Sequence, residues 1–279
     1  MIKDNRIIFD DNGTKTDYSA TLADIETGTV TLPVVALEDK LYLGSTFPFN
    51  HRYFSVSTAN TSASVISIEI YTSSGWVSAV DVIDKTSLAS KTLAQSGIIQ
   101  FAKPRNSSWT RVDTTENLTE LSGFKIYDKY WSRFTFSANL LASTAIKYVG
   151  HAFSTDGQLA ILYPDLNSST IKAAFSAGKT NWEDQAVMAA DQIIEDLQNR
   201  EYVYSGNQIM NFEKFQIASV HATALIIYRA FGDDYKDQFE QATKDYNSSL
   251  EKAIADIDKN GDGALQVGEQ FKELGVFRR

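Results

Sequence analysis

No cysteine occurs among the 279 residues of the sequence. Disulfides, thiolate metal sites and cysteine nucleophiles are therefore excluded. Proline is also scarce: the chain has 4, and all of them precede residue 165. Because proline interrupts helix interiors, the proline-free stretch 165–279 favours helices, whereas the part before it favours strands. The expected chain is α+β with two domains, a β-rich one at 1–164 and a helical one at 165–279.

Long apolar runs are missing as well. No segment approaches the roughly 18 apolar residues that a membrane-spanning helix requires. Residues 1–4 lack the apolar core of a signal peptide. We therefore expect a soluble protein that is made in a cytoplasm and has no membrane partner.

Recognisable catalytic motifs are absent too. The sequence contains no zinc-protease, phosphate-loop, nucleophile-elbow or dinucleotide-binding signature. The 3 histidines are His51, His151 and His221. His221 lies in an apolar helical stretch, where packing explains it better than general-base chemistry. We expect no catalytic residues and no enzymatic activity, with a hydrolase that uses two carboxylates as a minor alternative.

Acidic residues outnumber basic ones, 35 to 26, which gives a formal net charge of −9. Residues 233–273 alone hold 11 acidic and 5 basic residues, a net charge of −6. Because such a segment repels phosphate backbones, we do not expect sequence-specific nucleic-acid binding, whereas metal cations are attracted.

Short strands dominate the pattern of the first 164 residues. In 64–71 (SVISIEIY), Ile66, Ile68 and Ile70 alternate with other residues, which predicts a half-buried strand. Other β-branched and aromatic segments are bounded by turn residues. The predicted strands are 6–10, 28–36, 40–44, 52–58, 64–71, 76–77, 97–102, 108–112, 130–137 and 145–149. Their number and spacing predict an antiparallel β-sandwich of jelly-roll type.

A helical period replaces this alternation in the second half. The predicted helices are 169–176, 181–200, 212–231 and a long helix from Asp233/Asp234 to residue 257. Thr180 and Glu183 have the spacing of a capping box, and Gly232 is expected to end the third helix. That helix is apolar nearly all round, so we expect it at the centre of a helical bundle.

Residues 258–269 (DKNGDGALQVGE) match the spacing of an EF-hand loop. That loop places oxygen ligands at positions 1, 3, 5, 7, 9 and 12, with glycine at position 6. The predicted Ca²⁺ ligands are Asp258, Asn260, Asp262, the carbonyl of Ala264, Gln266 and Glu269. A single loop of this kind favours a structural calcium site over a switch. The alternative is an acidic turn that merely links two helices.

Trp76, Trp109 and Trp131 fall in the β-rich part. Exposed tryptophans could stack on sugar rings, whereas buried ones would fill the core or an intersubunit face. The pattern favours packing. It leaves open, as an alternative function, a carbohydrate- or receptor-binding β-sandwich with a calcium-bearing helical oligomerisation domain.

Three features of the helical half occur together. They are the segment TNWEDQ at 180–185, the apolar segment ASVHATALIIYRAFG at 218–232, and a long helix with Phe239, Tyr246 and Leu250 before the acidic loop. In this the chain resembles the head–tail connector (adaptor) proteins of tailed bacteriophages. The β half, with LYLGS at 41–45, PFN at 48–50, GW at 75–76 and SG at 96–97, is similar to an extension on some neck proteins.

The resemblance implies a structural virion protein that assembles in the host cytoplasm. Such a protein forms a homo-oligomeric ring, dodecameric in this family, in the neck between portal and tail. Its implied partners are the portal protein and tail or neck proteins, and it catalyses no reaction. Family adaptors often grip the portal with an extended C-terminal segment; only a few residues follow the calcium loop here, so that docking mode is not expected.

Overall fold

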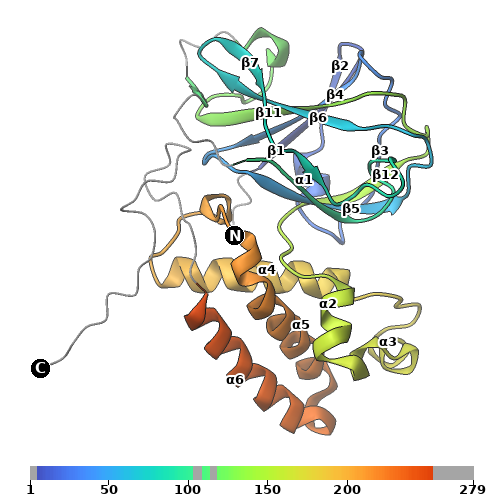
Figure 1. Cartoon of the computed structure of the whole chain (residues 1–279), viewed down its shortest axis with the longest axis vertical. Coiled ribbons are helices and arrows are strands. Elements are labelled where there is room, and N and C mark those ends of the chain that lie inside the picture. Colours follow the sequence, from blue (N-terminus) through green and yellow to red (C-terminus); the bar gives the residue numbers. More distant parts are fainter. Residues whose placement is uncertain (1–4, 103–108, 114–117, 254–279) are drawn as a thin grey trace, which may run out of the picture. The chain divides into compact units, whose positions relative to one another are not determined.

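The computed structural model describes residues 5–102, 109–113 and 118–253. The chain divides into two compact units, one that ends at Gly150 and one that begins at His151 (Figure 1). The boundary expected from the sequence was 164/165, directly after the last proline. Pro164 is instead the first residue of a 3₁₀ turn within the second unit, a position that tolerates proline.

The first unit, called here the β unit, consists of two antiparallel sheets. The first sheet runs β2 (Thr14–Asp17), β1 (Arg6–Asp11), β4 (Lys40–Ser45), β11 (Lys129–Phe136), β6 (Ile66–Thr72) and β7 (Gly75–Ser78), with β10 (Arg111–Val112) paired to β11. The second runs β3 (Val30–Thr31), β12 (Ala145–Gly150), β5 (His51–Thr58), β9 (Gly97–Gln100) and β8 (Ile83–Asp84). Two short helical segments, α1 (Ser19–Leu22) and η1 (Thr119–Leu121), lie in connections.

One hydrophobic core joins the two sheets. The alternation predicted for β6 is confirmed, because Ile66, Ile68 and Ile70 all enter this core. Phe54 and Ile146 of the second sheet enter it as well. The opposite face of the first sheet is covered by a second cluster, which contains Trp131 and the segment around η1. The first sheet therefore buries apolar side chains on both faces.

Two local predictions need correction in the β unit. The hairpin β1–β2 was missed, although Asn12 and Gly13 form a two-residue turn with φ of 44° and 92°, as Asn-Gly does in hairpins. The strand predicted at 28–36 is only Val30–Thr31 long. Residues 32–39 leave the ladder and cross to β4 of the other sheet.

The second unit, called here the helical unit, contains the elements that follow Gly150. They are α2 (Asp156–Leu162), η2 (Pro164–Asn167), α3 (Ser169–Phe175), α4 (Glu183–Asn199), η3 (Gly206–Gln208), η4 (Phe212–Phe215), α5 (Gln216–Phe231), η5 (Gly232–Tyr235) and α6 (Lys236–Lys252). The predicted order, strands first and helices second, is thereby confirmed. None of the helices in the described ranges is long and apolar enough to cross a membrane.

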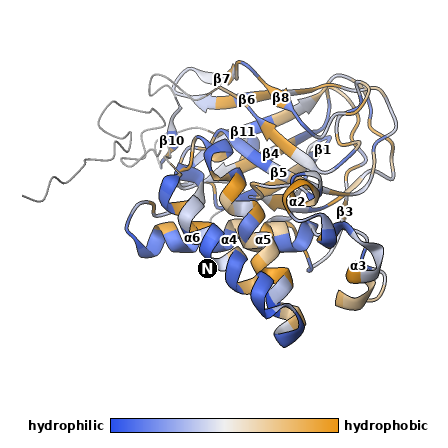
Figure 2. Cartoon of the chain, turned by 60° about the horizontal axis from the view of Figure 1, so that its bottom comes forward, coloured by the Kyte–Doolittle hydropathy of each residue, from blue (hydrophilic) through white to orange (hydrophobic). Residues whose placement is uncertain are grey.

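Helix α5 occupies the centre of the helical unit, as predicted. It packs against α2, α3, α4 and α6, and Gly232 ends it with a φ of 65°. The amphipathic α6 buries Ala242, Tyr246 and Leu250, while hydrophilic residues cover much of the rest of this helix (Figure 2). The pairing of an apolar central helix with amphipathic neighbours follows from these patterns.

Two predictions about helix ends are wrong. Trp182, not Thr180, is the N-cap of α4, and it makes no side-chain capping bond. Its backbone N–H instead donates to the Asp156 carboxylate at 2.9 Å, which fixes the start of the helix from outside. Helix α6 ends at Lys252 because Ala253 is extended, with φ −66° and ψ 115°, so it does not continue to residue 257.

Candidate functional site

The predicted calcium loop, 258–269, lies outside the described residues, and so do all 6 of its predicted ligands. Within the part of the chain that the structure describes, no group of three or more His, Cys, Asp or Glu residues could hold a metal ion. The calcium site therefore stays a prediction.

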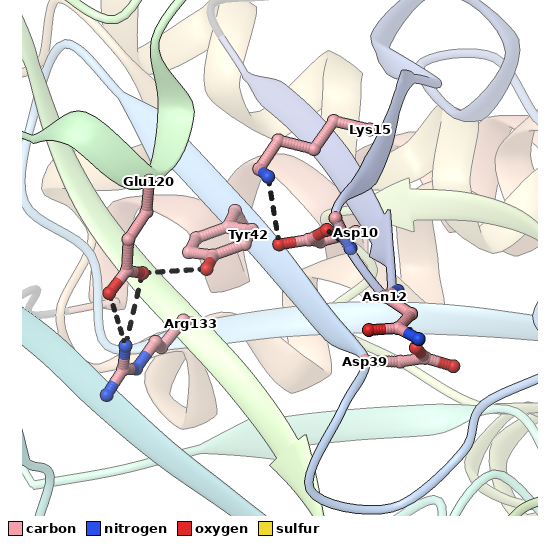
Figure 3. Close-up of polar contacts among 8 residues, drawn as sticks. Asp10, Asn12, Lys15, Asp39, Tyr42, Glu120 and Arg133 are labelled. Carbon is pink, nitrogen blue, oxygen red and sulfur yellow. Dashed lines mark hydrogen bonds and ion pairs between the residues drawn. The ribbon is translucent and has the colours of Figure 1, made fainter.

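A charged network lies on the outer face of the first sheet, beside the cluster that contains Trp131 (Figure 3). The guanidinium of Arg133, on β11, contacts two carboxylates: Nε lies 2.6 Å from Oε2 of Glu69 on β6, and Nη1 lies 3.1 Å from Oε1 of Glu120 on η1. Tyr42 Oη, on β4, donates to Glu120 Oε2 at 2.8 Å. Arg133 also lies over the ring of Trp76, 4.7 Å from its centroid.

One cation, Arg133, is shared by two carboxylates, those of Glu69 and Glu120, in this network. Burial lowers the pKa of Arg133, but the bond to Glu69 and the charges of Glu120 and Glu69 outweigh it and leave the pKa raised. The pKa of Tyr42 is raised by burial and then by the bond to Glu120. Neither group therefore gives up its proton at neutral pH. The arrangement fastens η1 to three strands and offers no free acid or base.

A second set of polar contacts holds the β1–β2 hairpin (Figure 3). Asp39, 1% exposed, accepts from Asn12 N at 2.9 Å and from Val35 N at 2.7 Å. Asp10 accepts from Gly13 N at 2.8 Å and pairs with Lys15 at 3.3 Å. Both carboxylates thus satisfy turn amides, which is a structural use of buried acid groups.

The tryptophans of the β unit are packing residues. Trp109 and Trp131 are 2% and 0% exposed, and their indole N–H groups donate to the carbonyls of Trp131 and Ile126. Trp76 lies between Tyr42 and Tyr71, with ring centroids 5.8 and 5.3 Å away. Trp109 and Trp131 are buried and cannot stack on a sugar, whereas Trp76 is partly buried and packs against its two tyrosine neighbours. The contacts therefore favour the packing interpretation.

The helical unit ties its tyrosines to acidic or imidazole partners across helices. Tyr163 Oη lies 2.7 Å from Nδ1 of His221, Tyr228 Oη donates to Asp165 at 2.8 Å, and Tyr246 Oη donates to Asp196. Burial raises the pKa of Tyr163, with smaller effects from Asp245 and Asp165, to about 12. Burial also lowers the pKa of His221, although the charge of Asp245 opposes this.

These pairs hold neighbouring helical segments together, and none of them has the arrangement of a catalytic acid and base. The lowered pKa favours the neutral form of His221, and its Nδ1 lies at hydrogen-bond distance from the hydroxyl of Tyr163, whose raised pKa favours the protonated form. His51 and His151 are buried and lie 3.0 Å from Asn50 Oδ1 and 3.1 Å from Asn207 Oδ1. The 3 histidines thus occupy three separate polar environments.

Sequence reasoning did not find the Arg133 network or the tyrosine pairs. Arg133 and Glu69 are 64 residues apart, and Tyr246 and Asp196 are 50 apart. No local spacing signals such pairs, because they arise from strand and helix neighbours. Comparisons of the chain with protein-family models, with curated proteins and with solved structures gave no match.

Proposed function

We propose that this chain is a structural neck protein of a tailed-phage virion, which forms a homo-oligomeric ring between portal and tail. In this proposal the two sheets act as a jelly-roll-type sandwich, and the helical unit carries the contacts with the portal and with tail or neck proteins. The loop at 258–269 binds a structural Ca²⁺ ion through Asp258, Asn260, Asp262, Ala264, Gln266 and Glu269, a donor set of oxygens that suits this hard cation.

One observation carries the proposal. The helical unit leaves large apolar side chains in water: Ile161 of α2 is 78% exposed, and Ile217 of α5 is 54% exposed. Exposed apolar side chains mark a contact with another protein chain where they form one contiguous patch, and in this proposal Ile161 and Ile217 belong to such a contact. The tyrosine, histidine and aspartate side chains described above for the same unit are hydrogen-bonded to one another. This favours a role in assembly over a role in catalysis.

The charge of the chain fits this role. At a formal charge of −9, a ring of many copies presents an acidic surface, and duplex DNA passing through its opening would not adhere to it.

Mass measurement with electron microscopy tests the ring directly. The purified full-length chain, studied by light scattering after size exclusion and by negative-stain imaging, should form closed rings. The double variant Ile161→Ser/Ile217→Ser should lower the mass to that of smaller species, whereas Val77→Ser, at an exposed position of the β unit, should not. A full-length chain that stays monomeric at every concentration, and that is missing from the necks of intact particles, would contradict the proposal.

A further inference from the structure

Asn12 and Gly13 form an exposed turn whose two residues can react with each other. In an asparagine–glycine pair, the glycine backbone nitrogen can attack the asparagine side chain, because glycine has no Cβ to obstruct the approach. Both residues of this turn are exposed. A Cβ built on Gly13 would meet no atom within 4 Å. The surroundings of the turn therefore leave room for the reaction.

The reaction replaces the side-chain amide of Asn12 by a carboxyl group. The backbone nitrogen of Gly13 bonds to Cγ of Asn12 and closes a five-membered succinimide ring. The Cγ–Nδ2 bond breaks, and Nδ2 leaves as ammonia with the proton that Gly13 N gives up. Water then opens the ring. Attack at Cγ gives aspartate, whereas attack at the backbone carbonyl carbon gives isoaspartate, whose main chain runs through Cβ and Cγ and is longer by one carbon.

The native turn holds the two reacting atoms apart. Positive φ at both central residues, 44° at Asn12 and 92° at Gly13, is typical of a type I′ turn, in which ψ of the first central residue is about +30°. About the Cα–C bond of Asn12, this ψ places Gly13 N on the side opposite to Cβ. Ring closure needs that nitrogen on the same side as Cβ. The Gly13 peptide plane must therefore rotate, which opens the turn.

Two buried carboxylates oppose this rotation (Figure 3). Gly13 N donates to Asp10 Oδ1 at 2.8 Å, and Asn12 N donates to Asp39 Oδ1 at 2.9 Å. Asp10 and Asp39 are 7% and 1% exposed, and hydrogen bonds to ionised acceptors are the stronger ones. The bond to Asp10 is the one that rotation must break, because it uses the nitrogen that attacks. Asp39 holds the other side of Asn12 in place.

We propose that Asn12 is a site of spontaneous deamidation, and that Asp10 controls its rate by keeping the turn closed. The consequence falls on β2, which is an end strand of the first sheet and pairs with β1. Either product adds a negative charge beside Asp10 and Asp39, and isoaspartate also lengthens the two-residue loop that sets the β1–β2 register. Deamidation thus loosens β2 and uncovers the edge of β1, a template for pairing with another strand. This site is independent of the ring contacts proposed above.

Peptide mapping by mass spectrometry tests the site on the full-length chain, incubated at mildly alkaline pH. We expect slow conversion of residue 12 in the folded chain and faster conversion in the same chain unfolded in guanidinium chloride. Asp10→Ala should speed conversion of the folded chain about tenfold or more, since one hydrogen bond to a charged group is lost. Asp10→Asn, which keeps an acceptor oxygen, should give a smaller increase. The second asparagine–glycine pair of the sequence, Asn260-Gly261, lies outside the described residues and is scored in a separate peptide.

Gly97→Ala distinguishes opening of the turn from unfolding of the whole β unit. Its added Cβ would lie 2.5 Å from Lys85 O, so it destabilises the second sheet without touching the turn. It should leave the rate at residue 12 unchanged. Equal acceleration by Gly97→Ala and Asp10→Ala would overturn the proposal. So would a folded chain that converts as fast as the unfolded one, or an Asp10→Ala variant that converts no faster than the unmodified chain.

Hydrogen exchange checks the effect on β2. Amides of residues 14–17 should exchange faster in the converted chain than in the fresh one, because β2 is loosened. Amides of residues 66–72, in β6 of the same sheet, should exchange at the same rate in both. Unchanged exchange at 14–17 after conversion would contradict the loosening of β2.

Discussion

Removal of the Arg133 charge tests whether the network on the first sheet fastens η1. The substitution Arg133→Met keeps an unbranched side chain over Trp76 but leaves Glu69 and Glu120 without their shared cation. Loss of one partner from a fully buried ion pair costs about 3–5 kcal/mol. Because Glu69 and Glu120 are 24% and 37% exposed, water relieves part of this cost. We therefore expect a loss of about 2 kcal/mol in the free energy of unfolding.

Denaturant titration followed by tryptophan fluorescence measures this loss, since Trp76, Trp109 and Trp131 all lie in the β unit. Arg111→Met is the matched control. Its pair with Asp128 has a similar distance, 2.9 Å, but side chains that are 50% and 77% exposed, so its removal should have an effect close to zero. Adding Glu69→Gln to Arg133→Met should restore part of the stability. Equal effects of Arg133→Met and Arg111→Met would refute the reasoning.

Three further predictions concern other parts of the chain. Gly97→Ala should destabilise the β unit by about 1–3 kcal/mol in denaturant titration, because its Cβ would lie 2.5 Å from Lys85 O, whereas Gly157→Ala in α2 should stabilise by about 0.5–1 kcal/mol. Because the pKa of Tyr163 is raised from 10.0 to about 12, its contribution is complete below pH 10.0 and is lost as the pH rises through 12; Tyr163→Phe should flatten that part of the stability–pH curve. Calcium binding by the full-length chain, measured by titration calorimetry, should disappear in Asp258→Ala, and equal binding by both proteins would refute the site.

Sequence analysis predicted correctly those helices and strands whose hydrophobic pattern matches the side chains that they bury. The alternation in 64–71 gave β6, and the apolar stretch at 212–231 gave the central α5 with its end at Gly232, since periodicity reports directly which residues are buried. The prediction of a strand over 28–36 was wrong in its length, also because of how burial relates to pattern. Leu32 and Val34 are buried, but they are buried while the chain crosses between sheets, and β-branched composition cannot distinguish a ladder from a crossing.

The polar clusters that the structure describes could not be predicted from the local sequence pattern. Arg133 meets Glu120 and Glu69 only because β11 lies beside β6 and η1 folds back over the sheet. Asn12 and Gly13, by contrast, carried a readable signal, since this dipeptide favours the two-residue hairpin turn that the structure contains. The capping box assigned to Thr180 had the right spacing but lacked the tertiary contact from Asp156 that sets the start of α4 at Trp182.

The end of α6 at Lys252 changes what calcium binding should do. In an EF-hand the entering helix continues into the loop, so that the ion stabilises the helix. Here Ala253 is extended, and α6 stops ahead of Asp258. Ligand binding raises the melting temperature only as far as the unfolding transition destroys the site. We therefore expect calcium to bind 258–269 while the unfolding midpoint of the helical unit, followed by circular dichroism at 222 nm, which reports its helices together, moves little. A large, calcium-dependent rise in that midpoint would show that α6 and the loop unfold together, and would contradict this separation.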